Sequence, residues 1–333
     1  KRLAHEQIAG GEAQLAVGTH ALFQAEVKFA RLGLMVVDEQ HRFGVDQRLA
    51  LREKVRHGDE YPHQLVMSAT PIPRTLAQTL YGDLDVSIID ELPPGRTSVQ
   101  TASLPEARRA QVVERIRAAC KAGRQAYWVC PLIEESDALQ LQTATETHAE
   151  VSAALPELRV ALVHGRMKSA EKEATMRTFK NGEIHLLVAT TVIEVGVDVP
   201  NASLMVIENA ERLGLSQLHQ LRGRVGRGSD ASSCVLLYRS PLSPTARARL
   251  ACMRETHDGF EIARRDLELR GPGEMFGIRQ TGLANLRVAD LVRDQALLPK
   301  VAQAAEVLLR NHPDNIAPLI ARWLGYAERY GQV

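Results

Sequence analysis

The chain has 333 residues, a formal net charge of +1, 45% hydrophobic residues and only 4% aromatic residues. Its length predicts two or three domains, and the scarcity of aromatic residues predicts cores built from aliphatic side chains. A nearly neutral chain lacks overall basicity, so any nucleic-acid-binding surface has to come from local clusters of cations.

The sequence also argues against a membrane, secreted or zinc-binding protein. No apolar run approaches the roughly 20 residues that a membrane span requires, and the first residues carry no apolar signal segment. The four cysteines lack metal-ligand spacing, so we expect reduced core thiols of a cytosolic protein at Cys120, Cys130, Cys234 and Cys252.

Short apolar runs alternate with amphipathic helical segments along most of the chain. The predicted strands are residues 14–17, 32–37, 64–67, 125–129, 160–163, 184–189, 204–207 and 234–238. Most of these runs are continuously apolar, which is typical of strands that helices cover on both faces. The predicted fold class is therefore α/β, with parallel sheets built from βαβ units.

Two helical segments between the strands are well marked. Residues 107–122 form the first, and residues 169–181 form the second. Ser169 is a candidate N-cap because its hydroxyl can accept from the first-turn amides, and Gly182 follows as a stop.

Two proline-rich segments predict domain boundaries. Residues 92–97, LPPGRT, continue neither a helix nor a strand. Beyond residues 240–244, SPLSP, the strand pattern stops and the chain becomes arginine-rich and then helical. The predicted domains are residues 1–95, 96–240 and 241–333.

A pair of carboxylates, Asp38 and Glu39, follows the apolar run LMVV at residues 34–37. An apolar strand ending in Asp-Glu is the Walker B arrangement of P-loop NTPases, in which the first carboxylate holds the water shell of Mg²⁺. The second carboxylate then orients or deprotonates the attacking water. The alternative is a solvated turn after a strand, but His41 completes an Asp-Glu-x-His box that is far rarer by chance.

Two hydroxyls, Ser68 and Thr70, follow the next predicted strand at residues 64–67. Hydroxyls at a strand end can bond to a neighbouring carboxylate or histidine, and so carry the state of a nucleotide towards DNA. The alternative is a plain Ser/Thr turn before Pro71. The position after the Asp-Glu box favours the functional interpretation.

A third polar segment is residues 189–200, ATTVIEVGVDVP. Thr190 and Thr191 are candidates to donate hydrogen bonds to DNA phosphates. Gly196 permits close backbone approach, and Asp198 is available to a ribose hydroxyl.

The most specific string is residues 217–228, QLHQLRGRVGRG. Arg224 and Arg227 are three positions apart, and each follows a glycine. This pattern suits an arginine finger that stabilises charge on the γ-phosphate in the transition state. The alternative is a basic turn that binds backbone phosphates.

In this order the motifs resemble motifs II, III, V and VI of superfamily 2 helicases. Residues 17–20 (VGTH) resemble the DNA-contacting motif Ib of a first RecA-like domain, while residues 127–130 (YWVC) and 163–167 (VHGRM) resemble motifs IV and IVa of a second. The resemblance spans essentially the whole chain. It implies two RecA-like domains with parallel sheets, the first truncated, followed by a helical C-terminal extension.

The resemblance also implies roles for individual residues. The catalytic residues would be Asp38, Glu39, Arg224 and Arg227, with Asp38 holding Mg²⁺ through water. Nucleotide binding and coupling would involve Gln40, His41, Gly196, Asp198 and Gln220. DNA contacts would come from Gly18, Thr19, Ser68, Thr70, His164, Gly165, Thr190 and Thr191.

Two strings narrow the resemblance. Residues 38–44 (DEQHRFG) and 69–76 (ATPIPRTL) are similar to RecG helicases and to the transcription-repair coupling factor. Residues 258–274 and 279–282 resemble a translocation motif that these two families share. Gln40, where the coupling factor usually carries glutamate, favours the RecG family.

The C-terminal part predicts a helical hairpin at residues 245–254 and 259–269, with a glycine-rich loop at 271–282. We hypothesise that the hairpin senses rotation between the motor domains and that the loop moves duplex DNA. The alternative is a solvated helical pair with a loop of no special role. The translocation candidates are Arg247, Arg264, Arg265, Arg270, Arg279, Gln280 and Thr281.

A phosphate-binding Walker A loop requires Gly-Lys-Ser/Thr, and none of the 23 glycines is followed by lysine. We interpret this as truncation within the first motor domain. We therefore expect the isolated chain to bind ATP and Mg²⁺ weakly and to be inactive as an ATPase.

The resemblance implies that the full protein is an ATP-dependent DNA helicase acting on double-stranded and branched DNA. It further implies a bacterial cytoplasmic, nucleoid-associated monomer with no membrane contact, and single-strand DNA-binding protein as a partner. The alternatives are a coupling-factor motor, a non-catalytic DNA-binding module and a small-molecule enzyme. The last would require a Gly-x-Gly-x-x-Gly turn after the first strand.

Overall fold

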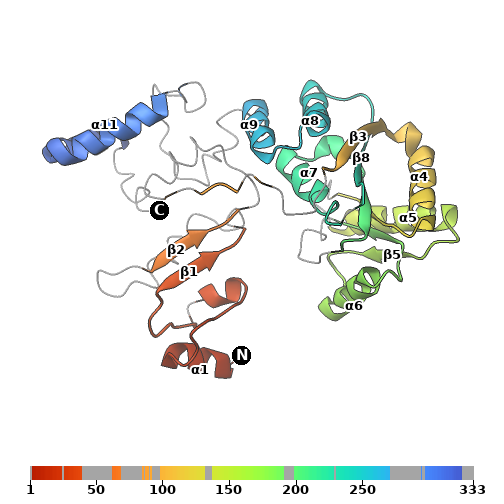
Figure 1. The fold of residues 1–333 in the computed structure, drawn as a ribbon, viewed down its shortest axis with the longest axis horizontal. Helices are drawn as coiled ribbons and strands as arrows, with labels where there is room; N and C mark the ends of the chain where they lie inside the picture. Colours follow the sequence, from red (N-terminus) through yellow and green to blue (C-terminus); the bar gives the residue numbers. More distant parts are fainter. Residues whose placement is uncertain are drawn as a thin grey trace. The chain divides into compact units, whose positions relative to one another are not determined.

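A computed structural model of the protein describes residues 2–24, 26–39, 62–68, 85, 87–89, 91, 98–131, 137–190, 199–228, 230–270, 294 and 297–324. The chain divides into two compact units (Figure 1). Unit 1 comprises Lys1–Val86 and Arg270–Val333, and unit 2 comprises Ser87–Leu269.

Unit 1 contains a small parallel sheet. Its strands β1 (Leu34–Val37) and β2 (His63–Val66) pair in register from Leu34 with His63 to Val37 with Val66. Its other described elements are α1 (Arg2–Gly10), η1 (His20–Phe23), α11 (Leu298–Asn311), η7 (Pro313–Asn315) and α12 (Ile316–Leu324). Met35 and Val37 are buried, whereas Leu34 and Val36 are 57% and 50% exposed, so one face of β1 packs and the other is open.

Unit 2 is built on a six-stranded parallel sheet in the order β3-β8-β7-β4-β6-β5. The strands are β3 (Gln100–Pro105), β4 (Gln125–Val129), β5 (Val160–Val163), β6 (Leu186–Ala189), β7 (Ala202–Ile207) and β8 (Ser233–Tyr238). The helices are η3 (Glu106–Arg108), α4 (Arg109–Lys121), α5 (Asp137–Ala154), α6 (Ser169–Lys180), η5 (Ala210–Arg212), α7 (Leu215–Arg222), α8 (Pro244–Glu255) and α9 (Gly259–Arg270). The predicted parallel α/β architecture is confirmed.

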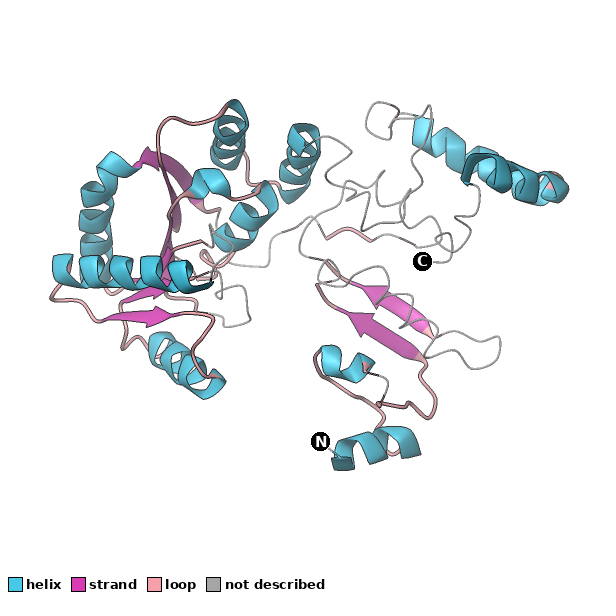
Figure 2. Ribbon diagram, turned by 180° about the vertical axis from the view of Figure 1, so that it is seen from behind, coloured by secondary structure: helices cyan, strands magenta, loops and turns pink. Residues whose placement is uncertain are grey.

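Helices cover both faces of this sheet (Figure 2). Strand β4 is buried along its whole length, and its side chains alternate between two hydrophobic clusters. Tyr127 lies in the cluster that includes α7 and α8, and Trp128 lies in the cluster that includes α4 and α5. Burial on both faces explains why the inner strands are continuously apolar.

Three details differ from the sequence-based expectations. The strand predicted at residues 14–17 is wrong: the segment is not a strand, and Leu15 and Val17 are 82% and 87% exposed. The prediction missed β3, which lies at the edge of the sheet and has the mixed polar sequence QTASLP. Ser169 is the first residue of α6 rather than its N-cap, which is Lys168.

Replacing Phe179 by Ala should destabilise unit 2, because this ring is fully buried and packs against Tyr127 with ring centroids 5.0 Å apart. Removing a buried aromatic side chain costs about 3–5 kcal/mol. Urea denaturation followed by Trp128 fluorescence, in a W323F background, measures the change. Lys180→Ala, an exposed neighbour, is the control and should change the free energy of unfolding by less than about 0.5 kcal/mol. Equal effects of the two changes would contradict the packing.

Candidate functional site

The two acidic residues of the Asp-Glu box lie at the carboxyl end of β1. Asp38 is exposed, and its Oδ1 accepts a hydrogen bond of 2.8 Å from the Glu39 N–H. Glu39 is partly buried and has a left-handed backbone with φ of 53°. Residues other than glycine are uncommon in this conformation and concentrate at functional sites. An exposed carboxylate at a strand end fits the water shell of Mg²⁺.

Ser68 follows β2 at the same edge of the small sheet as Asp38. The pairing of the strands continues past their ends, since the Met67 N–H donates to Val37 O at 2.8 Å. Ser68 is exposed there. The predicted neighbours Gln40, His41 and Thr70 lie outside the described residues.

The predicted motif Ib residues, Gly18 and Thr19, are exposed ahead of η1. The Thr19 carbonyl accepts from the Leu22 N–H at 3.0 Å. A Cβ at position 18 would lie 2.9 Å from Leu22 Cγ, so glycine suits this close approach.

In unit 2, the loops after β5 and β6 lie side by side at the carboxyl edge of the large sheet. The Thr190 N–H donates to Val163 O at 3.2 Å, which places Thr190 beside the residue that follows β5, His164. Thr190 is buried, and His164 is partly buried. The next residue, Gly165, is exposed, and its carbonyl accepts from Lys172 Nζ at 2.7 Å. The structure therefore brings together these predicted DNA-binding residues; Thr191, Gly196 and Asp198 lie outside its described part.

The arginine-rich motif begins on α7 and continues into the following turn. Gln220 and Arg224 are partly buried, whereas Arg227 is exposed, with its Nε 3.4 Å from Gly223 O. Gly228 lies against the backbone of Pro200, where an added Cβ would be 2.5 Å from the carbonyl oxygen. The turn is thus held tightly while Arg227 extends to solvent.

Sequence reasoning missed the role of Arg222 in the same motif. This guanidinium is 4% exposed, and its Nη1 donates to the carbonyls of Met253 and Thr256, both at 3.0 Å. Burial lowers the pKa of Arg222. Its helical spacing from Leu215 and Leu218, on the apolar face of α7, is the signal that predicts an inward side chain.

Arg249 makes the reverse connection from α8. Its Nη1 donates to Leu213 O at 2.6 Å, and its Nη2 donates to Glu211 O at 2.8 Å. The buried Arg222 and the partly buried Arg249 therefore join α7 and α8 reciprocally, each through carbonyls in or next to the other helix.

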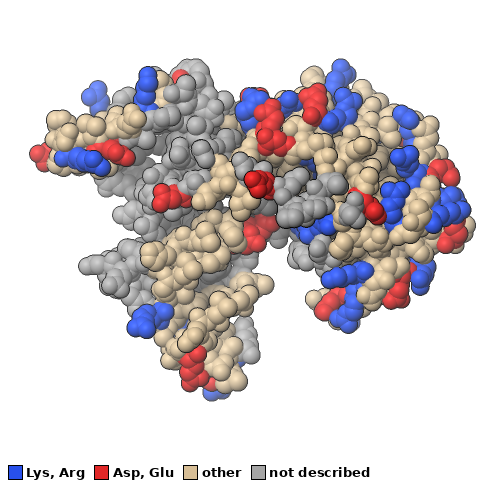
Figure 3. Space-filling model, viewed as in Figure 1, with Lys and Arg blue, Asp and Glu red and all other residues tan. Residues whose placement is uncertain are grey.

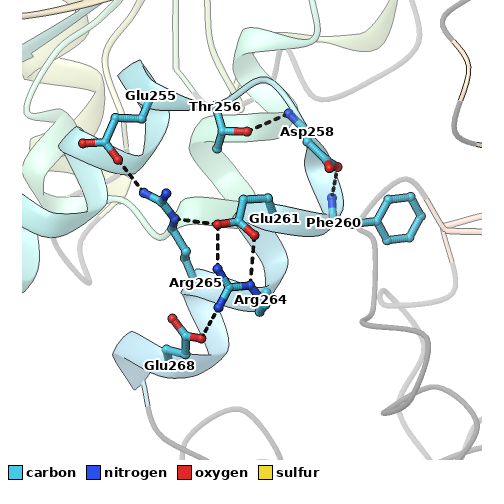
Figure 4. Close-up of polar contacts among 8 residues, drawn as sticks. All are labelled: Glu255, Thr256, Asp258, Phe260, Glu261, Arg264, Arg265 and Glu268. Carbon is cyan, nitrogen blue, oxygen red and sulfur yellow. Dashed lines mark hydrogen bonds and ion pairs between the residues drawn. The ribbon is translucent and has the colours of Figure 1, made fainter.

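The predicted hairpin of α8 and α9 is present, and an ion pair between Arg265 and Glu255 connects its helices (Figure 4). Arg265 bonds to Glu255 of α8 at 2.6 Å and to Glu261 at 2.9 Å, and Arg264 bonds to Glu261 at 2.7 Å. Arg264 and then Arg265 lower the pKa of Glu261 to about 2. Carboxylates thus offset much of the positive charge expected on this hairpin.

The remaining translocation candidates are less defined. Arg247 is exposed on α8, and Arg270 is the last residue of α9. Arg279, Gln280 and Thr281 lie outside the described residues. On the face shown in Figure 3, acidic and basic side chains intermingle over unit 2 and form no field of one sign.

Within the ranges that the structure describes, no three His, Cys, Asp or Glu side chains form a metal-binding group. Among the helices described there, none has the length and apolarity that a bilayer span requires.

Three family models match successive parts of the chain. The model for DEAD/DEAH box helicases matches residues 1–79, and the model for the helicase conserved C-terminal domain matches residues 104–229. A third model, for the C-terminal part of domain 3 of the ATP-dependent DNA helicase RecG, matches residues 256–324.

Curated relatives and a solved structure agree with these matches. RecG of Escherichia coli K12 is 62% identical over 331 residues, covering 99% of this chain and 48% of the relative. RecG of Bacillus subtilis 168 is 49% identical over 305 residues, covering 91% of this chain and 44% of the relative. The structure of RecG bound to a three-way DNA junction is 44% identical, with a TM-score of 0.65, covering 90% of this chain and 38% of that one. The chain therefore belongs to the RecG family of ATP-dependent DNA helicases, and it spans about half the length of the curated relatives it matches.

Proposed function

We propose that the intact protein is an ATP-driven double-stranded-DNA translocase that remodels branched DNA in recombination and repair. Its substrates would be stalled replication forks and Holliday junctions. The observation that carries this proposal is the likeness, at 44% identity and a TM-score of 0.65, to a RecG whose structure holds a three-way DNA junction. The model that matches residues 256–324 describes domain 3 of RecG, which favours this family over the transcription-repair coupling factor.

In ATP hydrolysis, Asp38 would hold the water shell of Mg²⁺, and Glu39 would orient the attacking water. Mg-ATP supplies the phosphoryl group. Arg224 and Arg227 stabilise the charge that develops on it. We assign nucleotide contact and coupling to Gln40, His41, Gly196, Asp198 and Gln220. The acidic strand end and the exposed Arg227 support these roles and argue against a non-catalytic module.

Most of the proposed DNA contacts lie just after strand ends, whereas Gly18 and Thr19 precede η1. Gly18, Thr19, Ser68 and Thr70 would serve in unit 1, and His164, Gly165, Thr190 and Thr191 in unit 2. Their support is the adjacency of Thr190 and His164 at one sheet edge and the exposure of Gly165 and Ser68. Backbone amides and hydroxyls at such positions bind phosphates without reading sequence, as a translocase requires.

We assign translocation to the hairpin and the loop that follows it, through Arg247, Arg264, Arg265, Arg270, Arg279, Gln280 and Thr281. The reciprocal bonds of Arg222 and Arg249 support this assignment, because they connect the arginine-rich motif to α8. We further propose a bacterial cytoplasmic, nucleoid-associated monomer that contacts single-strand DNA-binding protein.

Replacing Arg227 by Ala in the intact protein should abolish DNA-stimulated ATP hydrolysis, because a lost arginine finger typically costs about 10³-fold or more in kcat. Binding to a three-way junction, measured by fluorescence anisotropy, should persist. Arg177→Ala is the matched control, since Arg177 is an exposed arginine of α6 paired only locally with Glu173. Retained turnover in Arg227→Ala would reject the finger role.

The isolated 333-residue chain should show no DNA-stimulated ATP hydrolysis, because it carries no Gly-Lys-Ser/Thr sequence to hold the β- and γ-phosphates. A coupled phosphate-release assay with and without branched DNA, with the intact protein as positive control, measures this. Robust turnover by the purified chain would show that another segment holds the phosphates.

Gln280→Ala in the intact protein should uncouple fork unwinding from ATP hydrolysis, lowering unwinding more than turnover. Both rates are measured on the same forked duplex, and Gln303→Ala on α11 provides a glutamine control. If both rates match those of the unchanged protein, the loop does not move DNA.

A further inference from the structure

A buried acidic residue, Glu208, follows β7 and has no role in the proposed nucleotide or DNA contacts. Only 8% of its side chain is exposed. Burial of a carboxylate is costly unless cations and hydrogen bonds compensate for the lost water, and such pairs seldom stabilise a fold more than an apolar core would. Stabilisation of the fold is therefore a weak explanation for a buried carboxylate at position 208.

The side chain of Glu208 binds three separate elements. It forms an ion pair with Arg109, the first residue of α4. The Thr147 hydroxyl of α5 donates to its Oε2 at 3.4 Å, and the Cys130 thiol, after β4, donates to the same oxygen at 3.8 Å. Burial, followed by Glu208 itself, raises the pKa of Cys130 to about 12, so this thiol remains protonated as a donor.

Arg109 is held in place for this contact at some cost to its own helix. A cation at a helix N-terminus opposes the helix dipole. Its guanidinium lies 4.9 Å from the ring centroid of Trp128 and bonds to the exposed Glu150 at 3.2 Å. Stacking on the Trp128 ring and bonds to the carboxylates of Glu150 and Glu208 thus fix the position of the Arg109 guanidinium.

The main chain changes direction immediately after this anchored residue. The Glu208 N–H still donates to Val129 O of β4 at 3.0 Å, but Asn209 has a left-handed φ of 46° and is buried. From there the chain enters η5 and α7, whose Ala210 and Leu215 pack in the cluster on the opposite face from α4 and α5. Glu208 is therefore the last residue before α7 that bonds to the α4–α5 face of the sheet.

We propose that Glu208 is a positioning residue that fixes where residues 209–228 leave the sheet, and through them the placement of Arg224 and Arg227. The catalytic role of the two arginines rests on the proposed function, whereas the anchoring of residues 209–228 by Glu208 does not.

Glu208→Gln keeps the size of the side chain but removes its charge, so the fold should persist. Hydrogen exchange followed by mass spectrometry on this chain should show amides of α7 exchanging about tenfold faster, because the turn at Asn209 opens more often. Glu157→Gln is the matched control. Glu157 pairs with Arg117 and so connects α4 to the end of α5, without touching β7. Unchanged exchange in α7, or an equal rise in both variants, would overturn the anchor.

In the intact protein, Glu208→Gln should lower the kcat of DNA-stimulated ATP hydrolysis about tenfold, while KM for ATP and affinity for DNA change little. Glu157→Gln should leave all three unchanged. If Glu208→Gln lowers the melting temperature but leaves the turnover rate unchanged, the ion pair is purely structural and Glu208 does not position the arginines. If the unchanged intact protein fails to hydrolyse ATP, the proposed function is rejected, and the exchange result still decides whether Glu208 anchors the segment.

Discussion

Parallel pairing of strands is the constraint on which the candidate sites depend. Strands that run the same way end at the same edge, so the loops that follow them gather there whatever their separation in sequence. In unit 1 this brings Asp38 and Ser68 to one edge, and in unit 2 it brings His164 and Thr190 together. Parallel strands also require long crossover connections, which supply the helices that cover the sheet.

Packing on both faces makes the large sheet a rigid support. Its inner strands send alternate side chains into two separate apolar clusters, and each cluster holds its own set of helices. Three charged side chains add directional bonds to this packing: Arg222 and Arg249 bond between α7 and α8, and Glu208 bonds between β7 and the α4–α5 face. All three adjoin the arginine-rich segment, so its position is specified by directional bonds as well as by apolar contact.

The α8–α9 hairpin shows that positive charge counted in the sequence can exceed the positive charge available to a binding partner. Arg264 and Arg265 form an arginine pair in the sequence, yet both bond to Glu261, and Arg265 also bonds to Glu255. Side chains three and four positions apart on a helix meet on one face, so nearby carboxylates offset them. The hairpin is therefore an ion-paired connector, even though it also carries exposed arginines such as Arg247.

The sequence by itself determined the parallel α/β class, the family and the order of the motifs, because consecutive residues encode both strand apolarity and strings such as the Asp-Glu box. Prediction from the sequence failed where burial decides whether a segment forms a strand. The apolar run at 14–17 is exposed and is no strand, and the mixed sequence of β3 gave no apolar signal. Only the tertiary structure decided that Arg222 points inward and that Glu208 meets Arg109, 99 positions earlier. A buried polar group is defined by its partners, and folding alone brings distant partners together.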